Sequence, residues 1–161
     1  MENQSGRPAD WMEKTIMRYE NKLLRTAAAI VGGRAEAEDM VQDAFVKLLE
    51  KQPQFESAEH EAAWLIRVTV NLCISRLRSH QWKKTVPLLA DYPAQNDEQQ
   101  GIIEAILRLP AKYRTVIHLF YYEGYSTKEI AGITNQKEGT VREQLTRARR
   151  RLKECYEGES L

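Results

Sequence analysis

The stretch YSTKEIAGITNQKEGTVREQLTRARRRL, residues 125–152, decides the fold of the C-terminal part of this chain. It predicts two helices joined by a tight turn. Ser126 and Glu129 have the spacing of a capping box, which marks the start of the first helix. Asn135 stands at the turn, either as a residue with positive φ or as the cap of the second helix.

The second helix of this stretch has one apolar side and one basic side. Its apolar residues recur at helical spacings of four, three and four, which predicts a buried stripe of Val141, Leu145, Ala148 and Leu152. Residues 139–153 hold six Lys or Arg and one acid, Glu143. A solvated face is the alternative interpretation, but such faces usually mix both signs. The excess of cations favours phosphate contact, and a helix-turn-helix places its second helix in the major groove of DNA.

Charge elsewhere in the 161-residue chain is segregated. The net charge is only +1, although 29% of residues are charged. Residues 34–61 contain eight acids and three bases, a net of −5, whereas residues 76–84 contain four bases and no acid. This pattern predicts two kinds of partner, a basic protein surface and a nucleic acid.

Other signals argue against catalysis and against export. His60, His80 and His118 are isolated, without ligand spacing, and no glycine-rich phosphate loop is present. We therefore expect no enzyme activity, no cofactor and no metal, and we expect each histidine to be a surface or packing residue. Cys73 and Cys155 form no CxxC pattern and are expected to be reduced thiols. Without a signal pattern or a spanning apolar run, the chain is expected in the cytoplasm, with no direct membrane insertion.

Helical periodicity extends over almost the whole chain and predicts an all-α protein. We expect two small helical domains, residues 1–79 and 97–161, joined by a flexible linker over residues 80–96, where Pro87 and Pro93 interrupt the pattern. In the N-terminal domain, helices are expected over residues 11–31 and 35–51 and from Ser57 to about residue 79. The expected core of the third helix is Trp64, Leu65, Val68, Leu72 and Leu77. The expected apolar stripe of the second is Met40, Val41, Ala44, Phe45, Leu48 and Leu49.

The C-terminal domain is expected to begin with a helix over residues 97–107. Pro110 then opens the next helix at its first-turn position, and Gly124 ends that helix. The helix-turn-helix comes last.

Several groups of residues, in order along the chain, resemble the motifs of one family. AEDMVQDAF (37–45) resembles the first motif of the extracytoplasmic-function (ECF, group 4) sigma factors of bacterial RNA polymerase, within the sigma-70 family. WLIRVTVN (64–71), followed by RLR (76–78), resembles their promoter-melting helix. The C-terminal part of the chain resembles the second domain of that family at Leu109-Pro110, Arg114, EGYS (123–126), EIA (129–131), GTV (139–141) and RAR (147–149). The resemblance covers roughly residues 15–152.

The resemblance implies a role for each charged surface. It implies that core RNA polymerase docks on Glu38, Asp39, Gln42 and Asp43, for which plain solubility is the alternative. It implies that the single-stranded −10 element meets Asn71, Arg76, Arg78, Lys83 and Lys84, with a structural hydrogen bond as the alternative for Asn71. It implies that the −35 element, as duplex DNA, is bound by Thr140, Arg142, Glu143, Gln144, Thr146, Arg147, Arg149 and Arg150. It also implies an anti-sigma partner. Trp64 is expected in the core, and Trp82 could either stack or pack.

The chain departs from the family pattern in two places. Thr134-Asn135-Gln136 stands where a Leu-Gly-Ile-like run is usual, so two apolar anchors of the turn are missing. Arg142-Glu143-Gln144 stands where Lys-Ser-Arg is frequent, which we interpret as an altered −35 preference, with weakened −35 binding as the alternative. The competing function is a stand-alone helix-turn-helix regulator of duplex DNA, which has no use for Asn71 or for the acidic helix.

Overall fold

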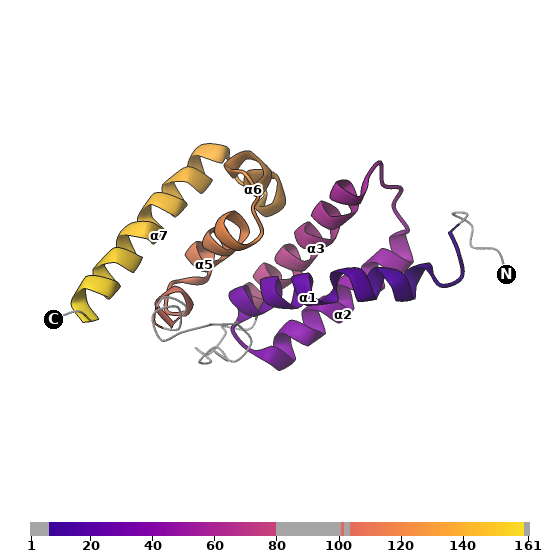
Figure 1. Cartoon of the computed structure of the whole chain (residues 1–161), viewed down its shortest axis with the longest axis horizontal. Helices are drawn as coiled ribbons and strands as arrows, with labels where there is room; N and C mark the ends of the chain where they lie inside the picture. Colours follow the sequence, from indigo (N-terminus) through magenta and orange to yellow (C-terminus); the bar gives the residue numbers. More distant parts are fainter. Residues whose placement is uncertain (1–6, 80–100, 102–103, 160–161) are drawn as a thin grey trace.

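The computed structural model describes residues 7–79, 101 and 104–159. All regular structure in these ranges is helical, which confirms the predicted all-α class. Figure 1 shows two lobes side by side, with the N-terminal helices in one and the C-terminal helices in the other. Trp82, Lys83, Lys84 and the predicted linker over residues 80–96 lie outside the described residues, as does most of the helix predicted over residues 97–107.

The N-terminal lobe consists of α1 (Trp11–Val31), α2 (Arg34–Lys51) and α3 (Ala58–Ser79). The first helix ends where the glycine pair predicted, because Gly32 adopts a left-handed conformation with φ 85°. Its N–H donates to the Ala28 carbonyl at 3.0 Å, which closes the last turn of α1. The three helices enclose an apolar core.

The C-terminal lobe consists of α5 (Ala111–Ile117), a π-helical turn η2 (His118–Tyr122), α6 (Thr127–Thr134) and α7 (Glu138–Glu159). The last two helices form the predicted helix-turn-helix. In α7 the buried stripe is as expected, except that its last residue, Leu152, is only partly buried.

The capping signals of α6 are confirmed. The Ser126 hydroxyl accepts from the Glu129 N–H at 3.1 Å, and the Glu129 carboxylate accepts from the Ser126 N–H at 3.0 Å. Asn135 adopts the left-handed conformation, with φ 54° and ψ 48°, and is the C-cap of α6. Of the two roles considered for Asn135, positive φ at the turn is therefore the one adopted.

Three expectations about the core and the helix ends were wrong in detail. Leu49 is 51% exposed, so the apolar stripe of α2 ends before it. Pro110 is the N-cap of α5 and not its first residue. The helix that was expected to run on to Gly124 changes at His118 into the π turn.

The buried side of α3 also differs from the prediction. Of the five predicted core residues only Leu65 is fully buried, and the others are partly buried. The deepest positions of α3 also include Ile66, Thr69, Val70 and Cys73. Thr69 can be buried because its hydroxyl donates to the Leu65 carbonyl at 2.8 Å.

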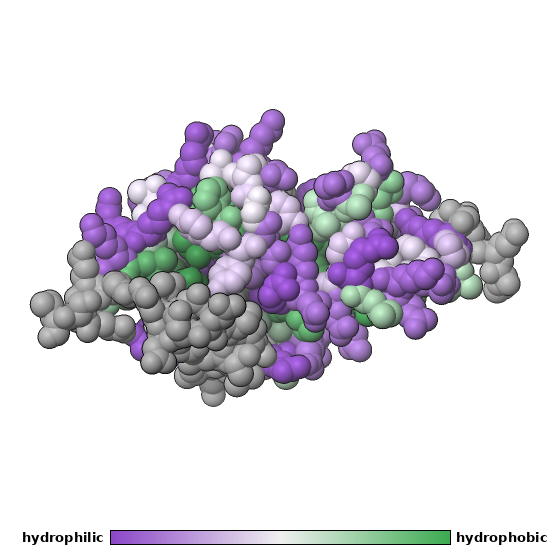
Figure 2. All heavy atoms as spheres, in the orientation of Figure 1, coloured by the Kyte–Doolittle hydropathy of each residue, from purple (hydrophilic) through white to green (hydrophobic). Residues whose placement is uncertain are grey.

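The two lobes pack directly against each other. Helix α1 contacts α5 and η2, and α3 contacts α6, so the apolar core continues from one lobe into the other. Figure 2 shows that hydrophilic residues cover much of the viewed face, with hydrophobic residues in smaller patches between them. The sequence predicted two domains, but it did not predict that they share an interface.

Candidate nucleic-acid interface

The outer side of α7 is the basic surface that the sequence predicted. Val141 and Ala148 are fully buried against the rest of the lobe. The predicted −35 residues that are exposed are Thr140, Arg142, Glu143, Thr146, Arg147, Arg149 and Arg150. Because the apolar stripe fixes the rotation of the helix, its cations line one solvent-facing side, as a groove-binding helix requires.

Two of the predicted −35 residues pair with each other. The Arg147 guanidinium lies 2.6 Å from the Glu143 carboxylate, one turn apart on α7, and both side chains are 59% exposed. A surface pair of this kind contributes only about 0.3–0.5 kcal/mol. DNA could therefore displace it at little cost, leaving Glu143 as an acceptor for cytosine and Arg147 as a donor.

Arg149 leans toward the π turn. Its Nε donates to the Tyr121 hydroxyl at 2.6 Å. Its guanidinium lies 5.7 Å from the ring centre of Phe120 and 5.6 Å from that of Tyr121. Arg151 similarly lies 5.0 Å from the ring centre of Tyr113. Two of the basic residues of α7 therefore also pack on the lobe's own aromatic side chains.

Polar contacts hold the turn, where the sequence lacks the family's apolar anchors. The Thr134 hydroxyl donates to the Ile130 carbonyl at 2.8 Å and accepts from the Gln136 amide at 2.8 Å. Gln144 Nε2 donates to Gln136 Oε1 at 2.8 Å, and Gln136 Nε2 reaches Gln144 Oε1 at 3.3 Å. Gln144 is thus half-buried and bonded to the turn, unlike its exposed neighbours on α7.

The predicted −10 residues of α3 border a cavity between the lobes. Asn71 and Arg78 are exposed and line this cavity of about 610 Å³, while Arg76 is half-buried and is not part of its lining. Arg67 and Lys112, which were not among the predicted −10 residues, also line it, and no acid lines it within the described part of the chain. Thr134, Asn135, Gln136 and Gln144 form its opposite wall.

The predicted polymerase-binding residues of α2 are exposed, namely the acids Glu38, Asp39 and Asp43 and the amide Gln42. Glu38 pairs with Arg34 at 3.0 Å. Beside them runs a groove of about 510 Å³ between α1 and α2, with Glu38 and Gln42 on its rim. Its apolar lining consists of Met12, Ile16, Leu24, Val41, Phe45, Val46 and Leu49. Leu49, which was predicted to belong to the apolar stripe of this helix, therefore lines a surface groove next to the acids.

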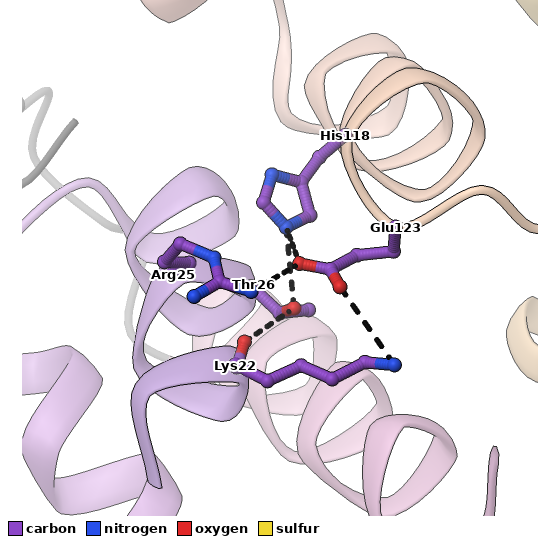
Figure 3. A network of polar contacts seen from close by, with 5 residues as sticks. All are labelled: Lys22, Arg25, Thr26, His118 and Glu123. Carbon is purple, nitrogen blue, oxygen red and sulfur yellow. Dashed lines mark hydrogen bonds and ion pairs between the residues drawn. The ribbon is translucent and has the colours of Figure 1, made fainter. Parts of the chain in front are cut away.

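A buried polar network joins the lobes (Figure 3). Glu123, only 5% exposed, lies 3.2 Å from His118 Nε2, 3.4 Å from the Arg25 guanidinium and 3.8 Å from the Lys22 ammonium. The hydroxyl of Thr26 donates to the Lys22 carbonyl at 2.9 Å, so at 3.2 Å it accepts from His118 Nε2. His118 is therefore buried, as the packing alternative predicted, and it also donates a hydrogen bond within the lobe interface.

The ionisation of Glu123 follows from this network. Burial alone raises the pKa of its carboxyl group, but the hydrogen bond from His118 and the charges of His118, Arg25 and Lys22 outweigh burial. The pKa of Glu123 consequently lies below its ordinary value of 4.5. The carboxylate is charged at neutral pH and attracts the cations of α1.

Arg114 makes a second connection between the lobes. Its guanidinium donates to the Ala29 carbonyl at 2.7 Å and to the Ile30 carbonyl at 2.5 Å, both in the last turn of α1. It also donates to the Leu109 carbonyl in its own lobe at 2.8 Å. No single-sequence signal points to the partners of Arg114 or Glu123 on α1, although both residues belong to the motifs quoted above.

Among residues 7–79, 101 and 104–159, no group of three or more His, Cys, Asp or Glu could hold a metal ion. Burial raises the pKa of the Cys73 thiol to about 12, so this thiol is not a nucleophile at neutral pH. Within the same ranges no helix has the length and apolar character needed to cross a membrane.

Comparison with known proteins identifies the two lobes. Residues 15–83 match the family described as sigma-70 region 2, and residues 99–152 match sigma-70 region 4. The chain is 30% identical over 145 residues to the ECF RNA polymerase sigma factor SigM of Mycobacterium tuberculosis, covering 87% of this chain and 74% of SigM. It is 30% identical over 155 residues to the ECF RNA polymerase sigma factor SigW of Bacillus subtilis, covering 84% and 83%.

A solved structure is similar over nearly the whole chain. The sigma factor RpoE from Bartonella quintana, solved in complex with the anti-sigma factor NepR, superposes with a TM-score of 0.72 at 28% identity. The match covers 92% of this chain and 98% of that one, and therefore includes both lobes. Together with the motifs and the helical lobes, these relatives establish that the chain belongs to the ECF sigma factors of RNA polymerase.

Proposed function

We propose that this chain binds core RNA polymerase in the cytoplasm and directs it to promoters, with residues 1–79 serving the −10 element and residues 97–161 the −35 element. The observation that carries the proposal is the pairing of two different basic surfaces on one chain. One is a helix with the rotation and charge of a groove reader, and the other is a concave face around Asn71. A stand-alone duplex regulator needs only the first.

The −35 surface is the exposed side of α7. Arg142, Thr146, Arg147 and Arg150 face solvent and can reach bases or phosphates without disturbing the core. In this proposal Glu143, which pairs with Arg147 in the free chain, accepts from cytosine once Arg147 turns to the DNA. Each well-made contact between a side chain and a base favours the correct base over a wrong one by about 1–3 kcal/mol. Thr140, Gln144 and Arg149 complete this surface, the last two through contacts that also hold the turn and the π turn.

The −10 surface is the exposed side of α3. An amide such as that of Asn71 can donate and accept together, which suits the edge of an unpaired base. Arg78, with Arg76 and the following Lys83 and Lys84, supplies cations for the strand backbone. Capturing a flipped base costs a few kcal/mol of lost stacking, which such edge and phosphate contacts offset.

Core polymerase is assigned to the acidic face of α2. Glu38, Asp39, Gln42 and Asp43 are exposed next to an apolar groove. An apolar centre with a charged rim is typical of a protein interface and not of a merely solubilising surface. In this proposal the chain has no catalysis of its own, and an anti-sigma protein is a further partner.

The test is equilibrium binding of the full chain to sigma-free core polymerase from the source bacterium. We expect stable association by the wild type and weaker association by Asp39→Ala with Gln42→Ala. The matched control is Glu13→Ala with Gln54→Ala, which removes one exposed acid and one exposed amide elsewhere in the same lobe. Salt-sensitive duplex binding without core association would favour the stand-alone regulator.

A further inference from the structure

The lobe arrangement in this structure cannot be the promoter-bound arrangement. Asn71 on α3 and Gln144 on α7 line one cavity of about 610 Å³. Elements centred near −10 and −35 lie about 25 positions apart, which is roughly 85 Å of duplex at 3.4 Å per position. Residues that share one cavity cannot contact both elements together. The chain must therefore separate its lobes to work as proposed.

The contacts that hold the lobes together are specific. The last four carbonyls of a helix lack partners within it. In α1, the Ala28 carbonyl is bonded by Gly32, while those of Ala29 and Ile30 accept from Arg114 of the other lobe. The last turn of α1 contains no basic residue of its own. Arg114 thus supplies the cation that the negative end of the helix dipole favours.

A second contact adds charge to the same interface. The Glu123 carboxylate forms ion pairs with Lys22 and Arg25 of α1. The Lys22 ammonium also lies 5.1 Å from the ring centre of Tyr125. The π turn matters here, because its i to i+5 hydrogen bond, from the Glu123 N–H to the His118 carbonyl, sets both side chains on one side. A buried carboxylate such as that of Glu123 is stable only when it is paired. When the lobes separate, water must therefore replace Lys22 and Arg25 around it.

We propose that Arg114 and Glu123 on the C-terminal lobe form, with the last three turns of α1, an autoinhibitory latch that keeps the free chain closed. In the closed chain Asn71 of α3 and Gln144 of α7 line the same cavity, so binding to polymerase and to both promoter elements requires the latch to open. The consequence for polymerase rests on the function proposed above, whereas the closure itself does not.

The first test measures closure alone, by small-angle X-ray scattering of the full chain at neutral pH. The test variant is Lys22→Gln with Arg25→Gln, which leaves Glu123 without its cations from α1. The control is Arg18→Gln, which removes a cation from the same helix whose partner, Glu61, lies within the N-terminal lobe at 3.6 Å. We expect a larger radius of gyration for the test variant only, with unchanged helical circular dichroism for all three proteins.

A charge swap separates electrostatic latching from a packing defect. Glu123→Lys alone should open the chain, and adding Lys22→Glu with Arg25→Glu should restore compactness. A wild type that scatters as an open chain, or a Lys22→Gln, Arg25→Gln variant as compact as the wild type, would overturn the latch. Neither result involves polymerase, so neither bears on the sigma-factor assignment.

The second test measures the consequence, with sigma-free core polymerase as the probe. If about one free chain in ten is open, full opening tightens the apparent dissociation constant by about tenfold. We expect that gain for Lys22→Gln with Arg25→Gln and none for Arg18→Gln. An opened variant that binds no tighter would show that closure does not restrain polymerase binding, and a wild type that fails to bind would instead refute the proposed function.

Discussion

Asn71, Asp39 and Gln42 are three exposed residues of the N-terminal lobe with different proposed tasks. All three lie in the N-terminal lobe, yet they stand on different helices, α3 and α2. Asn71→Ala should lower open-complex formation more than polymerase binding, because its amide serves the unpaired strand. Asp39→Ala with Gln42→Ala should do the reverse. Permanganate footprinting and core-binding titration measure the two effects, and equal effects from both variants would refute the assignment of the surfaces.

The Gln136–Gln144 amide pair is also a feature of single residues. It replaces apolar anchoring of the turn with reciprocal hydrogen bonds of 2.8 and 3.3 Å. Because a neutral hydrogen bond contributes about 0.5–1.5 kcal/mol, Gln136→Ala and Gln144→Ala should each destabilise the chain by about 1 kcal/mol. The double variant should cost less than the sum. Urea titrations would measure this cycle, and strict additivity would show that the pair does not hold the turn.

At the scale of elements, α7 has residues that face DNA and residues that also support its own lobe. Arg142 is exposed, whereas Arg149 donates a hydrogen bond to the Tyr121 hydroxyl at 2.6 Å. Arg142→Ala should lower the slope of log affinity against log salt by about one, as expected for a lost phosphate contact. Arg149→Ala should change that slope less and lower thermal stability more. Fluorescence anisotropy on −35 duplexes at several salt concentrations compares them, and identical slopes would contradict this division.

The ends of the helices could largely be predicted from the sequence, because short-range chemistry sets them. The Ser126–Glu129 capping box and the glycine after α1 act over a few residues. The buried side of α3 was less predictable, since Thr69 satisfies its hydroxyl within the helix and can enter the core. The π turn at His118 was missed because apolar periodicity does not distinguish π from α geometry over five residues.

At the scale of the whole molecule, the lobe interface could not be predicted from the single sequence. Arg114 bonds the carbonyls of Ala29 and Ile30, which lie more than 80 residues earlier in the sequence. Glu123 contacts Arg25, which lies 98 residues earlier. Nothing in local periodicity relates residues so far apart. The charged surfaces were predictable because they are contiguous in sequence and face solvent, whereas a buried contact between lobes depends on both partners being placed by their own folds.

Closure should depend on pH through Glu123. Its pKa is held below 4.5 while His118, Lys22 and Arg25 face it, so its charge stabilises the closed form above that pH. This stabilisation is lost as the pH falls through the lowered pKa, because the protonated carboxyl no longer attracts the cations. The radius of gyration should therefore rise on acidification below about pH 4.5 before helical signal is lost. Glu123→Gln should remove this step, and a wild type that unfolds without prior expansion would contradict it.

The most direct test of the central claim is run-off transcription by sigma-free core polymerase supplemented with the full chain, on a pool of genomic promoters. We expect initiation at promoters that share two sequence blocks, with Asn71→Ala impaired in opening them and Arg142→Ala impaired in recognising their upstream block. The sigma-factor function would be contradicted if the chain bound duplex DNA but core polymerase initiated at no shared two-block sequence.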